Sequence, residues 1–209
     1  MYDVTDCFPT DSISALDPGT NLLIVGPPMV GKREFALDLI ATGHDAGDAA
    51  LLIMSSESAA VPIEDLSQQR RALDADRIGI IDCMDNDDRR NIEGIETYSL
   101  SAPDDLPGIS TKSAKLLRSF AHHGVSTVRH GFISITTLLQ YLDRETVFKF
   151  LYIYKQRVVD TSGLGIFTID RTRHDKETLT MFESLCDGTI DLRVADSGER
   201  EVDVRGLDR

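Results

Sequence analysis

The stretch at residues 26–33, GPPMVGKR, constrains the fold of this chain more than any other part of its sequence. It follows a short apolar run at residues 22–25 and precedes a segment, residues 34–42, whose apolar residues recur at helical spacing. Glycines and a lysine at the spacing G-x-x-x-x-G-K between a strand and a helix match a phosphate-binding loop, in which backbone N–H groups surround the phosphates. The order strand, loop, helix therefore predicts an α/β sheet with a phosphate site at the end of a strand.

The last position of the loop departs from this pattern. Ser or Thr normally follows the lysine and binds Mg²⁺ through its hydroxyl, whereas Arg33 stands here. A guanidinium at this position either contacts a phosphate oxygen or faces solvent. The predicted nucleotide contacts are Gly26, Pro27, Pro28, Met29, Val30, Gly31, Lys32 and Arg33.

Short apolar runs alternate with helical segments along the rest of the chain, which is typical of a mainly parallel sheet. The runs at residues 50–54, 78–82, 126–135 and 166–170 predict further strands, the fourth of the five being broken by Gly131, and residues 116–123 and 144–159 predict helices. Residues 188–194 and 201–205 flank a turn and predict an antiparallel hairpin. With no repeat or linker in view, we expect one domain over residues 1–209.

Composition narrows the classes of partner. The chain carries 35 acidic and 22 basic residues and a net charge of -13, which argues against binding to a phosphate backbone. Such an acidic excess is typical of a high-salt cytoplasm, where salt screens self-repulsion, although an ordinary acidic surface is the alternative. Cys7, Cys83 and Cys186 form no metal or disulfide pattern and favour a cytoplasmic protein. No apolar run is long enough to span a membrane, and no signal peptide is evident.

Three segments together carry a family resemblance. These are LDPGTNLLIVGPPMVGK at residues 16–32, LLIMSSE at residues 51–57, and LCDGTIDLRVADSGEREVDVRGL at residues 185–207. Their order and spacing resemble the RecA superfamily of P-loop ATPases, in its KaiC- and RadA-like branch. The middle of the chain is most similar to single-domain KaiC-like proteins of extreme halophiles. The resemblance implies a RecA-like fold over nearly the whole chain and ATP as the ligand.

The resemblance also implies roles for single residues. Lys32 matches the phosphate-binding lysine. Glu57 falls where the family has the acid that activates the attacking water, although a solvated loop glutamate is the alternative. Ile133 stands where relatives have the aspartate that holds Mg²⁺, so both family contributions to magnesium are missing and a bound Mg²⁺ is doubtful. Asp170 either substitutes as a metal ligand or caps the turn that follows its strand.

These observations leave three hypotheses for function. The first is a KaiC-like nucleotide-binding protein with weak or lost hydrolysis, which acts in regulation or signalling through protein partners or its own copies. The second is an active ATPase that uses Glu57 and Asp170. The third is a recombinase-like DNA-binding protein.

Two further stretches suggest sites only weakly. Residues 104–117 resemble a DNA-binding helix-hairpin-helix element with Gly108-Ile109-Ser110 in the hairpin, although relatives have a helix of their own there and the acidic charge makes nucleic acid an unfavoured partner. The acidic residues at 82–88 lack metal-ligand spacing, so we expect a solvated surface.

Overall fold

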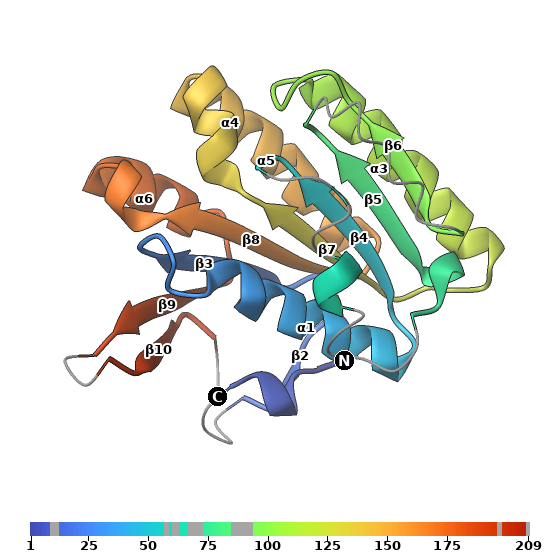
Figure 1. Cartoon of the computed structure of the whole chain (residues 1–209), viewed down its shortest axis with the longest axis horizontal. Coiled ribbons are helices and arrows are strands. Elements are labelled where there is room, and N and C mark those ends of the chain that lie inside the picture. Colours follow the sequence, from blue (N-terminus) through green and yellow to red (C-terminus); the bar gives the residue numbers. More distant parts are fainter. Residues whose placement is uncertain are drawn as a thin grey trace.

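An eight-stranded sheet forms the centre of the computed structural model, which describes residues 1–8, 13–56, 59, 63–66, 73–84, 94–195 and 198–207 (Figure 1). The strands lie in the order β10-β9-β3-β8-β7-β4-β5-β6. Their bounds are β3 (Asn21–Gly26), β4 (Ala49–Met54), β5 (Ile78–Asp82), β6 (Glu96–Ser99), β7 (Val128–Ile133), β8 (Leu164–Asp170), β9 (Gly188–Val194) and β10 (Arg200–Arg205). Neighbouring strands are parallel except β9 and β10, which form an antiparallel hairpin. The predicted fold class is confirmed.

Helices cover both faces of this sheet (Figure 1). On one face lie α1 (Lys32–Ala46) and the small antiparallel pair β1 (Tyr2–Asp3) and β2 (Ala15–Leu16). On the other lie α3 (Leu106–His122), α4 (Ile135–Tyr141), α5 (Arg144–Asp160) and α6 (Lys176–Glu183). Short 3-10 helices are η1 (Thr5–Cys7), η2 (Ala75–Arg77) and η3 (Arg171–Arg173).

Most residues of the central strands are apolar because each strand is covered on both faces. Every residue of β3, β4, β7 and β8 is buried. Successive side chains of a strand point to opposite faces. Leu22 and Ile24 of β3 accordingly join the core beneath α1, while Leu23 and Val25 join the core beneath α3 to α6.

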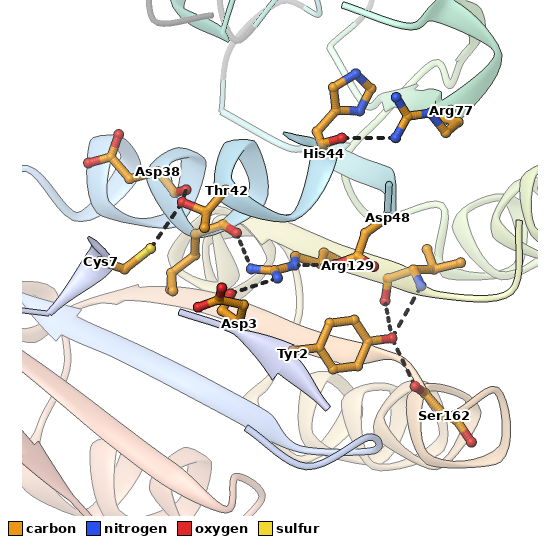
Figure 2. A network of polar contacts seen from close by, with 12 residues as sticks. Tyr2, Asp3, Cys7, Asp38, Thr42, His44, Asp48, Arg77, Arg129 and Ser162 are labelled. Carbon is orange, nitrogen blue, oxygen red and sulfur yellow. Dashed lines mark hydrogen bonds and ion pairs between the residues drawn. The ribbon is translucent and has the colours of Figure 1, made fainter. Parts of the chain in front are cut away.

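A buried arginine joins the first strand of the chain to α1 and to the sheet (Figure 2). The Arg129 side chain on β7 is 1% exposed, and its Nε donates to Asp48 Oδ2 at 2.8 Å. Its other nitrogens donate to the backbone oxygens of Leu39 at 2.6 Å and Asp3 at 2.8 Å. Tyr2 packs beside the guanidinium, 5.4 Å from the ring centre to the guanidinium carbon. The sequence analysis did not anticipate this network, which lies near the amino-terminal ends of β4 and β7.

The helix-hairpin-helix interpretation of residues 104–117 is wrong. α3 begins at Leu106 and runs without a break to His122. Asp105 is its N-cap residue and accepts a hydrogen bond from the Gly108 backbone N–H at 2.8 Å, and Pro107 lies in the first turn. Both features stabilise a helix N-terminus, so Gly108 belongs to the first turn and not to a hairpin.

The sequence predicted that Gly131 breaks its strand. This prediction is wrong, because β7 is continuous through Gly131. A Cβ atom on Gly131 would lie 2.7 Å from Ile40 Cδ1, so this glycine permits close packing of α1 on the sheet. The predicted run also ends too late, since Ile135 already begins α4. β6, α4 and α6 were not predicted.

Within the described part of the chain, no helix combines the length and the apolar character needed to cross a membrane.

Candidate functional site

The loop between β3 and α1 has the geometry of a phosphate-binding loop. β3 ends at Gly26, and α1 begins at Lys32 directly after Gly31. A Cβ on Gly26 would lie 2.8 Å from the Leu192 backbone oxygen, so a side chain there would collide with β9. Gly31 has a φ of 89°, a conformation that favours glycine. Each glycine is thus explained by the local backbone, and Gly31 has no side chain that could cap the first N–H groups of α1.

Lys32 lies across the loop. Its ammonium donates to the Pro27 backbone oxygen at 2.5 Å, and the side chain is about half-buried. Burial lowers the pKa of Lys32, and the nearby Asp170 carboxylate partly offsets this effect. The first N–H groups and the positive dipole end of α1 add to the lysine, so this end of the helix is suited to an anion.

An open cleft of about 420 Å³ adjoins Lys32. Its lining residues are Lys32, Ser55, Ser56, Met84, Ser134, Thr136, Thr137, Gln140, Tyr141, Asp170 and Arg173. They follow or lie close to the carboxyl ends of β3, β4, β5, β7 and β8. The chain passes from β3 to β4 across the positions of β8 and β7, so the cleft lies where an open parallel sheet binds ligands. Its volume falls in the range of about 300–1,000 Å³ that is typical of ligand pockets.

Hydroxyl groups tie the strand ends together on the floor of this cleft. Ser55 Oγ donates to the Ser134 backbone oxygen at 2.8 Å and accepts from the Ser134 N–H at 2.7 Å. Thr136 Oγ1 accepts from the Asp170 N–H at 2.8 Å and lies 3.1 Å from His174 Nε2. The ends of β4, β7 and β8 are therefore held in fixed positions beside Lys32. These serines and threonines were not predicted as site residues, because their pairing joins strands that are distant in the sequence.

Asp170 caps the turn after β8. Its Oδ1 accepts from both the N–H and the hydroxyl of Thr172 at 2.8 Å, and Oδ2 lies 3.8 Å from Arg173 Nε. The capping interpretation is therefore confirmed. The same carboxylate lines the cleft, and the alternative role as a metal ligand stays a prediction.

The two positions that depart from the magnesium pattern differ in environment. Arg33 forms an ion pair with Asp65, with Nη2 and Oδ2 2.6 Å apart, and Glu34 lies at 3.6 Å. The Arg33 side chain is 25% exposed, so it does not face open solvent, and its contact with a phosphate stays a prediction. Ile133 is 3% exposed and packs in the core beneath α1.

The described residues at this cleft are poor in the carboxylate ligands by which proteins hold Mg²⁺. Arg33 and Ile133 offer no side-chain oxygen. Among the described residues that line the cleft, Asp170 is the one carboxylate, and no cluster of three acidic, histidine or cysteine residues suited to a metal occurs in the described segments. Glu57, the predicted catalytic residue, lies outside the described residues.

Asp82 corrects one expectation about the acidic run at residues 82–88. It is 7% exposed at the end of β5 and is not a solvated surface residue. Its Oδ2 accepts from the Ala59 N–H and its Oδ1 from the Met84 N–H, both at 2.9 Å. The carboxylate holds the chain after β4 against the chain after β5. Residues 85–88 lie outside the described residues.

Comparison with known proteins agrees with this architecture. The chain is similar in structure to the KaiC-like protein PH0186 from the hyperthermophilic archaeon Pyrococcus horikoshii OT3, with a TM-score of 0.64 and 15% sequence identity. The alignment covers 92% of this chain and 81% of that chain. At this identity the likeness shows a shared KaiC-like RecA fold, and the predicted resemblance is confirmed at that level. No curated protein matches the chain.

A family model matches residues 19–192, a span that includes the phosphate loop, the lining of the cleft and most of the sheet. This span is most of the chain, and the chain therefore belongs to a family of unknown function, DUF7504.

Proposed function

We propose that this protein binds a nucleotide, ATP being the first candidate, in the cleft beside the phosphate loop. The observation that carries the proposal is the placement of Lys32 at the first turn of α1, directly after Gly31 and facing a cleft at the carboxyl ends of parallel strands. The KaiC-like RecA fold also supports a nucleotide as the ligand, because proteins of this fold bind nucleotides at this loop.

The same proposal includes weak or lost hydrolysis. Hydrolysis in P-loop ATPases uses Mg²⁺ to neutralise charge that develops on the phosphates. Arg33 and Ile133 replace the two protein groups that would hold this ion. Binding without turnover suits a regulatory protein, so we propose that the bound nucleotide controls contacts with a protein partner or with further copies of the chain.

Isothermal titration with ATP tests the binding proposal. We expect Lys32→Ala to weaken ATP binding by at least about tenfold, because it removes one charge-assisted contact to phosphate. Lys112→Ala is a matched control, since Lys112 of α3 does not line the cleft and its ammonium lies over the Tyr98 ring of β6, 4.6 Å from the ring centre. Absence of ATP binding at millimolar concentration by the unaltered protein would refute the proposal.

The second candidate is an active ATPase. Asp170 lines the cleft and carries an oxygen that accepts no hydrogen bond from Thr172, which favours a role for this carboxylate as a metal ligand. Glu57 follows β4 in the sequence and would orient water. A phosphate-release assay distinguishes the candidates: turnover that Glu57→Ala abolishes would establish the ATPase and contradict lost hydrolysis.

DNA binding has less support. The helix-hairpin-helix interpretation fails in α3, and the net charge of -13 repels a phosphate backbone. Retention on single-stranded DNA that weakens with salt would restore this candidate.

We further propose a cytoplasmic location in a high-salt cell, because the net charge of -13 matches such an environment.

A further inference from the structure

The described residues that line the cleft carry a net charge of opposite sign to that of the chain. The described residues that line the cleft include two cations, Lys32 and Arg173, and one acid, Asp170. The chain as a whole carries -13. A local cationic excess in an acidic protein raises the concentration of anions at that place and repels them elsewhere.

Lys32 and Arg173 interact electrostatically across the cleft. Arg173 lowers the pKa of Lys32, an effect that is smaller than those of burial and of the neighbouring carboxylates. Two like charges that face one cleft are stabilised when an anion lies between them. Arg173 and Lys32 come from different elements, η3 and α1, so their proximity is a product of the sheet order that places β8 beside β3.

Arg173 can reach an anion while its backbone stays fixed. Its side chain is 58% exposed, and its contact with Asp170 Oδ2 is long at 3.8 Å. The turn beneath it is rigid because Asp170 Oδ1 caps η3 through Thr172. Arg171, two residues earlier, is instead committed to the buried Asp191 on β9. Of the two arginines of η3, Arg171 therefore binds the β9–β10 hairpin and Arg173 lines the cleft.

We propose that the cleft binds its nucleoside triphosphate as a metal-free anion, and that the Arg173 guanidinium supplies the positive charge that Mg²⁺ supplies in related folds. The proposal rests on the proposed nucleotide function. Arginine suits this role because its planar fork donates two parallel hydrogen bonds to phosphate oxygens and keeps its charge at every physiological pH. The protein groups that would position Mg²⁺ are replaced by Arg33 and Ile133, so charge neutralisation falls to side chains of the protein.

Titration calorimetry with ATP, in excess EDTA and again in excess Mg²⁺, tests this proposal on the full chain. We expect the dissociation constants of the unaltered protein for ATP in EDTA and in Mg²⁺ to agree within about threefold. Arg173→Ala should weaken binding in EDTA by about tenfold, the loss of one charge-assisted contact, and Arg173→Lys should restore part of it. Arg118→Ala is the control, because the Arg118 side chain is exposed on α3, donates to the Ala114 backbone oxygen and does not line the cleft.

Separate outcomes overturn the two proposals. If Mg²⁺ strengthens ATP binding by more than about threefold, or if Arg173→Ala binds ATP as the unaltered protein does, the metal-free site is refuted while nucleotide binding stands. If the unaltered protein binds ATP in neither buffer, nucleotide binding itself is refuted. Circular dichroism of each variant shows whether a loss of binding reflects unfolding.

Discussion

Gly43 should reverse the usual effect of replacing a helical glycine by alanine. In an exposed helix, Gly→Ala stabilises by about 1 kcal/mol because alanine loses less backbone entropy on folding. Gly43 lies within α1, where an added Cβ would lie 1.9 Å from Arg129 Nε and 2.5 Å from Arg129 Cζ. The arginine would have to leave its position (Figure 2).

The cost follows from what Arg129 holds. Displacing the guanidinium breaks its ion pair with Asp48 and its hydrogen bond to the Leu39 backbone oxygen, both buried. Breaking one side of a buried ion pair costs about 3–5 kcal/mol. Subtracting the alanine gain of about 1 kcal/mol predicts that Gly43→Ala lowers the free energy of unfolding by roughly 2–4 kcal/mol.

Urea unfolding followed by circular dichroism measures this change. With an m value of about 2 kcal/mol/M, the middle of the range for small domains, the midpoint should fall by about 1–2 M. The control is the same substitution in an Arg129→Ala background, where the Cδ and Nε atoms that collide with the added Cβ are absent and Gly43→Ala should be neutral or stabilising by up to about 1 kcal/mol. A stabilising Gly43→Ala in the unaltered protein would refute the reasoning, and so would an equal destabilisation in both backgrounds.

The remaining predictions concern pH and salt. His130 is fully buried beside the Tyr154 hydroxyl, and burial lowers its pKa to about 3. The unfolded chain takes up this proton below about pH 6.5 and the folded chain does not, so His130 should cost roughly 2 kcal/mol of stability between pH 7 and pH 5. Urea unfolding of His130→Gln should show a smaller loss of stability over this range, and an equal loss would contradict the prediction. Raising KCl from 0.1 to 1 M shortens the screening length from about 10 to about 3 Å, which weakens repulsion within a chain of charge -13. The thermal unfolding midpoint should therefore rise with KCl, and an unchanged or lower midpoint would exclude adaptation to high salt.

Much of the fold could be predicted from local patterns. Each of the buried runs that became β3, β4, β5 and β8 was placed within two residues at either end, and the hairpin of β9 and β10 was expected. These elements can be predicted from the sequence because their apolar runs and turn residues lie within a few positions of one another. β6 was missed because it is an edge strand with a mixed burial pattern.

The part of the candidate site that is contiguous in the sequence could also be predicted. The phosphate loop is a contiguous motif whose glycines, lysine and flanking elements could be recognised without knowledge of any distant residue. The fold confirms the order of strand, loop and helix, while nucleotide binding stays a prediction. The absence of an acid at residue 133 was likewise evident, because it depends only on the alignment of one strand end with the family pattern.

Contacts between distant segments could not be predicted in this way. The pairing of Arg33 with Asp65, the burial of Asp82 and the placement of Arg173 in the cleft each depend on how strands are ordered across the sheet. Periodicity reports which face of an element is buried, and carries no information about which element covers that face. Local sequence was enough for the phosphate loop and most strands, whereas the charges that surround the loop result from packing, because they belong to residues that meet only when the sheet has formed.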